Sequence, residues 1–217
     1  MKSQLMKAFF ITTIAILAAC SLSAQDYYDY KELDTLESYL ENSFLKIGVG
    51  YWMPNGELSQ FIDNSPLFEL AYVVPDSNKN RSFEIGIQLA VPQQKEFFLI
   101  TDGIEQFEVE ATSIVNGYLK FNKYFFKKPN SKLGLGIALG IASIFVDPLD
   151  AAGAQSLDYD SVNSVLVAPG LFLDHTFNDD SMVQFSIDVQ YTPFKMERAV
   201  TRDLNSFTVV PKIAYRF

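Results

Sequence analysis

The chain has 217 residues, a length that suits one domain with a sizeable core. Aromatic residues make up 14% of it and charged residues only 20%, a composition that excludes a disordered chain. The formal net charge of −9 argues against nucleic acid as a partner, because the phosphates would repel the chain.

Residues 1–24 have the pattern of a cleaved secretory signal peptide. Lys2 and Lys7 form a positive start, and the apolar stretch at 8–19 is too short to cross a bilayer. Small residues then precede Gln25, so we expect cleavage between "SLSA" and "QD".

A competing signal lies inside this segment. The sequence "LAAC" at 17–20 resembles the lipobox of bacterial lipoproteins, in which the cysteine, here Cys20, is lipidated. We favour cleavage after Ala24, which leaves a mature chain without cysteine and with 15 Lys and Arg against 26 Asp and Glu, a net charge of −11. Residues 25–43 then form an acidic N-terminal segment that lacks strand alternation.

From residue 44 to the end, apolar and polar residues alternate with a period of two, which predicts β-strands. In the stretch 182–192, for example, Val183, Phe185 and Ile187 alternate with Gln184 and Ser186. Eight such strands are predicted, at 44–53, 67–74, 82–91, 113–126, 133–142, 164–177, 182–192 and 206–217.

The connections between these strands alternate in length. Short polar turns follow the second, fourth and sixth strands, and longer segments follow the first, third, fifth and seventh strands. An even number of strands with short turns on one side and long loops on the other is typical of an antiparallel up-and-down transmembrane β-barrel. In that arrangement both ends of the barrel lie on the turn side.

Three features distinguish this barrel from a soluble one. The second face of strand 133–142 consists of Gly and Ala, which suits a crowded lumen. Aromatic residues on the apolar faces gather near the strand ends, as at the two membrane interfaces. The middle of each apolar face carries no charge, which is typical of a face that contacts lipid. The fold class is therefore all-β, an eight-stranded transmembrane barrel over 44–217.

The last seven residues, "PKIAYRF", keep the strand pattern to the final aromatic residue, although Pro211 lacks one backbone donor. In lipid every backbone donor must be paired, so the last strand must close the barrel against the first. The ending with Tyr215 and Phe217 resembles the assembly signal that the barrel-insertion machinery reads in bacterial outer-membrane proteins. Residues 44–217 as a whole resemble the small eight-stranded outer-membrane barrels of the OmpA-like class, and the "SAQ" cleavage context resembles that of Bacteroidota members. The resemblance implies a Gram-negative outer membrane, contact with lipids and lipopolysaccharide, and periplasmic termini.

Eight charged residues fall on the face predicted to line the lumen, with equal numbers of each sign. A continuous ion path is one interpretation. We favour a plug of internal ion pairs, because eight strands leave space for little beyond side chains. The residues are Lys46, Glu69, Glu84, Lys120, Asp174, Asp188, Lys212 and Arg216.

The sequence contains no strong pattern for catalysis or metal binding. The lone histidine, His175, lies beside the "NDDS" turn, away from the outer leaflet where barrel enzymes that modify lipid A pair a histidine with a serine. Asp147, Asp150, Asp158 and Asp160 share a loop, but their spacing does not match a calcium-binding EF-hand. We therefore predict no catalytic residues, no cofactor and no metal.

The predicted function is non-enzymatic: a structural or surface-binding role of the long loops. The alternative is an accessory barrel subunit with an envelope protein partner, as in a protein secretion system. A lipid A-modifying enzyme or a small channel is less favoured.

Overall fold

In the computed structural model of the protein, the described residues are 42–76, 80–101, 106–149, 161–177, 181–196, 199–201 and 203–216. The predicted signal peptide, almost all of the acidic segment, and Phe217 lie outside these ranges. No helix among the described residues is long and apolar enough to span a membrane.

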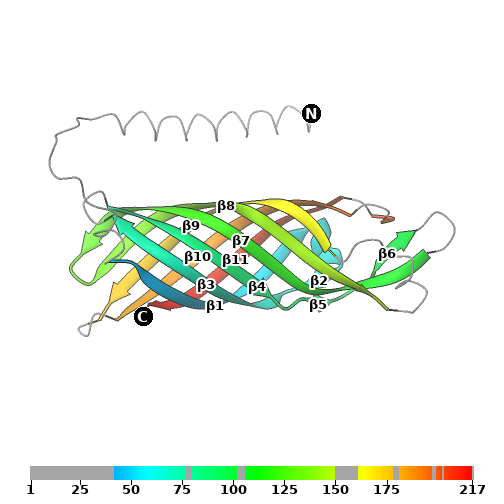
Figure 1. Cartoon of the computed structure of the whole chain (residues 1–217), viewed down its shortest axis with the longest axis horizontal. Coiled ribbons are helices and arrows are strands. Elements are labelled where there is room, and N and C mark those ends of the chain that lie inside the picture. Colours follow the sequence, from blue (N-terminus) through cyan, green and yellow to red (C-terminus); the bar gives the residue numbers. More distant parts are fainter. Residues whose placement is uncertain are drawn as a thin grey trace, which may run out of the picture. The chain divides into compact units, whose positions relative to one another are not determined.

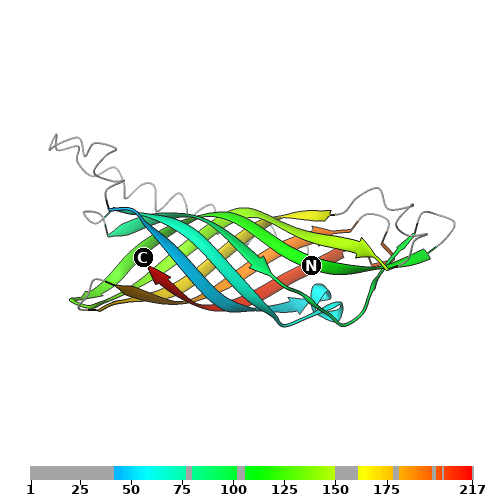
Figure 2. The same cartoon turned by 60° about the horizontal axis from the view of Figure 1, so that its bottom comes forward.

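Eight antiparallel strands close into a ring (Figure 1). The last strand pairs with the first, with Arg216 opposite Lys46 and Lys212 opposite Gly50, and the two lie side by side in Figure 2. The predicted eight-stranded antiparallel up-and-down barrel is confirmed. In order around the ring the strands are β1 (Phe44–Gly56), β3 (Ser65–Asp76), β4 (Arg81–Ala90), β7 (Gln106–Lys128), β8 (Ser131–Pro148), β9 (Ser161–Thr176), β10 (Met182–Lys195) and β11 (Asp203–Arg216).

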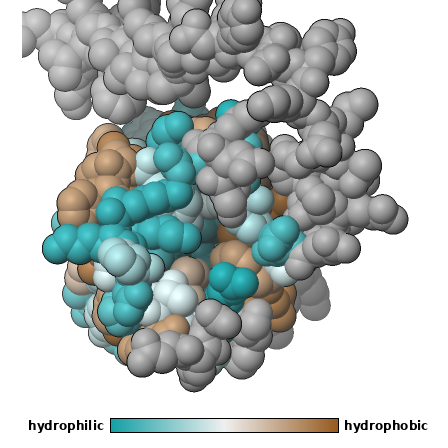
Figure 3. All heavy atoms as spheres, turned by 90° about the vertical axis from the view of Figure 1, so that its left-hand side faces the viewer, coloured by the Kyte–Doolittle hydropathy of each residue, from teal (hydrophilic) through white to brown (hydrophobic). Residues whose placement is uncertain are grey.

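The period of two sorts each strand into an outer apolar face and an inner face. In β1, Ile47 is 45% exposed, whereas its neighbour Lys46 is 1% exposed. Leu119 on β7 and Ile141 on β8 are each 62% exposed on the outer face. So much exposed apolar surface is stable only against lipid, which makes this a transmembrane barrel. Figure 3 shows hydrophobic side chains around the flank and hydrophilic ones at the turn end.

Pro211 interrupts the pairing of β11 with β1 locally. The pairing of β11 with β1 runs to Gly50 opposite Lys212 and resumes at Met53 opposite Val209. Proline has no N–H to donate, so the ladder is interrupted beside it. On its other side Pro211 stays in register with β10, opposite Ile187.

Toward the loops the strands are longer than predicted from the sequence, and additional short elements are present. β7 begins at Gln106 and β8 continues to Pro148, beyond the predicted limits of 113 and 142. Alternation continues past a register shift between Ala111 and Ser113, and this irregularity obscures the pattern in the sequence. Short elements fill the loops: η1 (Glu57–Gln60), β2 (Ile62–Asp63), β5 (Gln93–Gln94) and β6 (Phe98–Thr101), of which β6 pairs with β7.

Candidate functional site in the lumen

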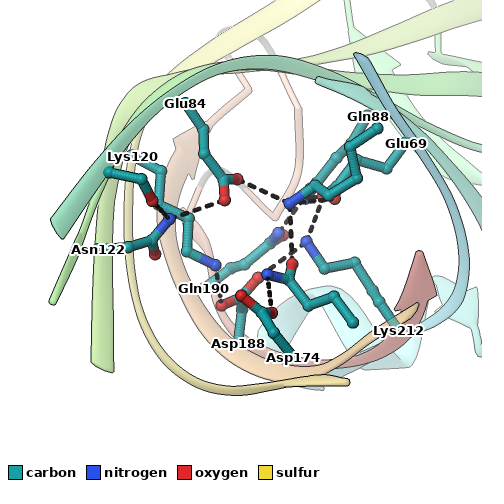
Figure 4. Close-up of polar contacts among 12 residues, drawn as sticks. Glu69, Glu84, Gln88, Lys120, Asn122, Asp174, Asp188, Gln190 and Lys212 are labelled. Carbon is teal, nitrogen blue, oxygen red and sulfur yellow. Dashed lines mark hydrogen bonds and ion pairs between the residues drawn. The ribbon is translucent and has the colours of Figure 1, made fainter. Parts of the chain in front are cut away.

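The barrel brings together seven of the eight charged side chains predicted to face the lumen (Figure 4). Each comes from a different strand, and each is at most 5% exposed. Only β8 contributes none, because its inner face at the depth of the network is Gly and Ala. The seven residues are Lys46, Glu69, Glu84, Lys120, Asp174, Asp188 and Lys212.

Six of these form one chain of ion pairs with alternating sign. Its order is Glu84, Lys46, Glu69, Lys212, Asp188, Lys120. Lys46 Nζ lies 2.8 Å from Glu84 Oε2 and 3.6 Å from Glu69 Oε1. Lys212 Nζ contacts Glu69 Oε2 and lies 2.9 Å from Asp188 Oδ2. Each internal charge therefore has two partners of opposite sign, which offsets the large cost of removing it from water.

Amide side chains satisfy further carboxylate oxygens along this chain. Asn122 Nδ2 donates to Glu84 Oε1 at 2.7 Å, and Gln88 Nε2 donates to Glu69 Oε2 at 2.7 Å. Hydrogen bonds to charged groups are stronger than neutral ones, so these amides fix the carboxylates in place. The amides extend the network across β4 and β7.

Asp174 is held differently from the other three carboxylates. Tyr124 Oη donates to its Oδ2 at 2.9 Å, and Gln184 Nε2 donates to its Oδ1 at 2.7 Å. The amide of Gln184 also links it to the ion-pair chain, because Gln184 Oε1 accepts from Lys46 Nζ at 2.9 Å. Asp174 thus joins the network through neutral donors.

Arg216 does not enter this network. Its guanidinium lies over the ring of Phe44, 4.1 Å from the centroid, at the turn end of the barrel where the side chain is half-buried. Alternation places Arg216 on the inner face but says nothing of depth, and the last residue of a strand lies at the rim. The charge balance in the described lumen is therefore three lysines against four carboxylates, not the predicted four against four.

Small residues on β8 and β9 make room for the network. A Cβ on Gly136 would overlap the Asn122 amide and lie 2.6 Å from Lys120 Cε. A Cβ on Gly170 would overlap the Asp188 carboxylate. The predicted reason for the Gly and Ala face, a crowded lumen, is the one the structure gives.

Toward the loops lies an apolar cluster that was not predicted from the sequence. Leu58 on η1 and Ile62 on β2 are fully buried, and the rings of Phe61 and Phe98 stack with centroids 4.8 Å apart. Gly56, at a φ of +88°, permits the turn from β1 into η1. The signal was present in the strands, where inner positions near the loops change from polar to large apolar. The buried apolar residues include Trp52, Leu58, Ile62, Leu67, Phe98, Ile114, Ile144, Leu166, Phe194 and Leu204.

His175 lies at the turn end of β9, as predicted. Its Nδ1 is 3.0 Å from Ser131 Oγ, and its ring packs edge-on against Phe177 at 4.8 Å. Its neighbour Asp174 points to the opposite face of the strand and is bound to Tyr124 and Gln184. The carboxylate therefore cannot orient this histidine as a triad requires.

Of the four loop aspartates considered for calcium, only Asp147 is among the described residues. It lies opposite Glu110 in the register of β7 and β8. Within the described ranges, no group of three or more His, Cys, Asp or Glu residues is placed to hold a metal ion.

The ring of strands, the apolar outer face and the buried polar network define a small transmembrane β-barrel. Among solved structures, the attachment invasion locus protein Ail of Yersinia pestis is similar, with 15% identity over 81% of this chain and 97% of that chain and a TM-score of 0.47. A structure of Ail with the heparin analogue sucrose octasulfate gives 13% identity, the same coverages and a TM-score of 0.49. Outer membrane protein W of E. coli gives 18% identity over 81% and 97% of the two chains, with a TM-score of 0.40.

No protein-family model matches the sequence, and no curated protein matches it either. The fold assignment therefore stands on the strand register of this chain itself.

Proposed function

We propose that this protein is a closed, non-enzymatic outer-membrane barrel of a Gram-negative bacterium that acts through its loop end. The observation that supports the proposal is that buried side chains lie on the inner face at two levels. The ion-pair network occupies one level, and the apolar cluster occupies the other, nearer the loops. If these side chains fill the lumen, the protein would interact with partners through its outer surfaces.

The loop end offers such a surface. β6 and the first residues of β7 continue the sheet, and Val200 N donates to Leu99 O at 3.0 Å to tie a further loop to it. Phe97, Leu99 and Val200 are between 40% and 61% exposed there. Exposed apolar groups on an ordered loop sheet support a structural or surface-binding role. Affinity purification from native membranes distinguishes this role from that of an accessory subunit, which would retain a stoichiometric protein partner.

The position of the first and last residues of the strand ring supports an orientation of the barrel. Phe44 and Arg216, which begin and end the ring, lie with the short turns. In bacterial outer-membrane barrels the short turns face the periplasm. The termini would then be periplasmic, with lipopolysaccharide around the loop end. Tyr215, 41% exposed on the outer face of β11, would be read together with Phe217 by the insertion machinery.

The first expected result concerns the membrane barrel itself. Purified protein in detergent should migrate differently on a gel before and after heating, because a closed barrel resists unfolding by cold detergent. Circular dichroism of the unheated sample should be rich in β-structure. A water-soluble monomer in the absence of detergent would contradict the proposal.

The second expected result concerns the lumen. Wild-type protein in planar bilayers should show no stable porin-like conductance, because an eight-stranded barrel filled by side chains lacks a continuous water path. Asp188→Ala, which removes a partner of Lys120 and Lys212, should lower the unfolding temperature and produce at most small, flickering currents. Large, long-lived, ion-selective openings of the unmodified protein would favour a channel instead.

A further inference from the structure

The turn that joins β7 to β8 carries an exposed group of lysines, Lys127, Lys128 and Lys132, which we call the basic hairpin. It belongs to the turn end, where hydrophilic side chains gather in Figure 3. Lys127 and Lys128 lie beyond the last members of the lumen network along β7, and Lys132 lies at the edge of the network, opposite Asp174 in the register of β8 and β9.

The sheet at this point sets like charges against each other. Lys127 lies directly opposite Lys132 in the register of β7 and β8. Like charges in directly opposite positions destabilise strand pairing. Such a pair at the turn end of the barrel favours a partner that supplies negative charge.

Within the described residues, the contacts of the basic hairpin leave that demand unmet. Lys127 Nζ donates to the amide oxygen of Asn80, Lys128 Nζ lies 5.7 Å from the ring centroid of Phe126, and Lys132 Nζ lies 5.8 Å from that of Tyr124. An amide oxygen and two ring faces attract an ammonium group but carry no formal charge. Of the three lysines, only Lys132 lies opposite a carboxylate, that of Asp174, so the charges of Lys127 and Lys128 are available to an anion.

The depth of the hairpin identifies the anion. Phe125 and Phe126, in the same stretch of β7, are 58% and 48% exposed. Exposed aromatic residues at the end of a membrane strand lie at the interface between acyl chains and headgroups. The neighbouring amines then lie at the level of the lipid phosphates.

We propose that the basic hairpin binds the headgroups of anionic phospholipids in the leaflet that borders the turns. This inference rests on the proposed membrane location. The amines are exposed and spread over a two-stranded rim, which suits a surface of many phosphates better than one small free anion. Binding would neutralise the opposed lysines and hold the turn end of the barrel against that leaflet.

The test uses the full protein folded into phosphatidylcholine vesicles that contain a minority of phosphatidylglycerol. Spin-labelled analogues of the two lipids serve as probes, because the resonance spectrum separates lipid immobilised by the barrel from free lipid. We expect the wild type to prefer phosphatidylglycerol by about fivefold at low salt, the factor by which one lysine near a membrane attracts anionic lipid. The variant Lys127→Gln/Lys128→Gln/Lys132→Gln should bind the two lipids equally while keeping heat-modifiable migration.

A control variant, Lys95→Gln/Lys195→Gln, removes exposed lysines from the loop end and should keep the wild-type preference. Equal immobilisation of both lipids by the wild type would overturn this inference alone, whereas no immobilised lipid at all would overturn the membrane location on which it rests. Undiminished preference in the triple variant would also overturn it. So would stronger displacement by inorganic phosphate than by chloride at equal ionic strength, because that result would indicate a free-anion site.

Discussion

Replacing Lys212 by methionine is expected to lower the free energy of unfolding by about 3–5 kcal/mol, the usual cost of removing one partner from a buried ion pair. Lys212 contacts Glu69 and Asp188 together, and its side chain is 2% exposed. Methionine fills similar space but leaves two carboxylates short of a partner. Urea unfolding in detergent, followed by the fluorescence of the single tryptophan, Trp52, measures the loss.

The matched control is Lys95→Met at the loop end. Lys95 Nζ lies 3.2 Å from Asp63 Oδ1, but both side chains are more than 40% exposed. The backbone amide of Asn64 and then Lys95 hold the pKa of Asp63 below its ordinary value, and the Asn64 amide remains when Lys95 is replaced. We expect the unfolding midpoint to stay near that of the wild type, because exposed pairs contribute little to stability. Equal losses in the two variants would mean that the lumen is hydrated and that the ion-pair chain is not structural.

The alternation of the sequence was enough to predict the ring of strands and the inner face of each. Each residue of a barrel strand faces either the lumen or the lipid. The charge of Lys46 and the apolar side chain of Ile47 therefore indicate which face each residue occupies. The partners within the lumen were not predictable in the same way. Lys46 and Glu84 are 38 residues apart, and Lys120 and Asp188 are 68 apart. Such contacts depend on the stagger between strands across the barrel, which no local pattern encodes.

The depth of a residue along the barrel was the second feature that could not be predicted from the sequence. Arg216 and Lys212 share the inner face of β11, but only Lys212 lies deep enough to join the network. The same limit concealed the apolar cluster, where Trp52 continues the inner face that begins with Lys46. Its closure depends on Leu58 and Ile62, which come from loop elements without strand alternation.

Gly117 and Gly140 lead to a second prediction with a large expected effect. They lie close together, but the space around Gly140 is crowded and the space around Gly117 is open. Gly140 on β8 has an inner position, and a Cβ there would overlap the carbonyl oxygen of Gly117 and lie 2.8 Å from Tyr118 Cα. These are backbone atoms, so no side-chain rotation relieves the clash. Gly140→Ala is therefore expected to lower the free energy of unfolding by about 1–3 kcal/mol, the range for overpacked sites. The same urea titration measures it.

Gly117→Ala is the control at the same depth, and its expected effect has the opposite sign. A Cβ on Gly117 would meet nothing within 4 Å, and neither glycine has a positive φ. Alanine there restricts the unfolded chain without straining the folded one, so the variant should be stabilised by about 0.4–1 kcal/mol. A loss of stability in Gly117→Ala as large as that in Gly140→Ala would place the cause in the strand backbone. A loss confined to Gly140→Ala means instead that the close approach of β8 to β7 sets the space in which the lumen side chains pack.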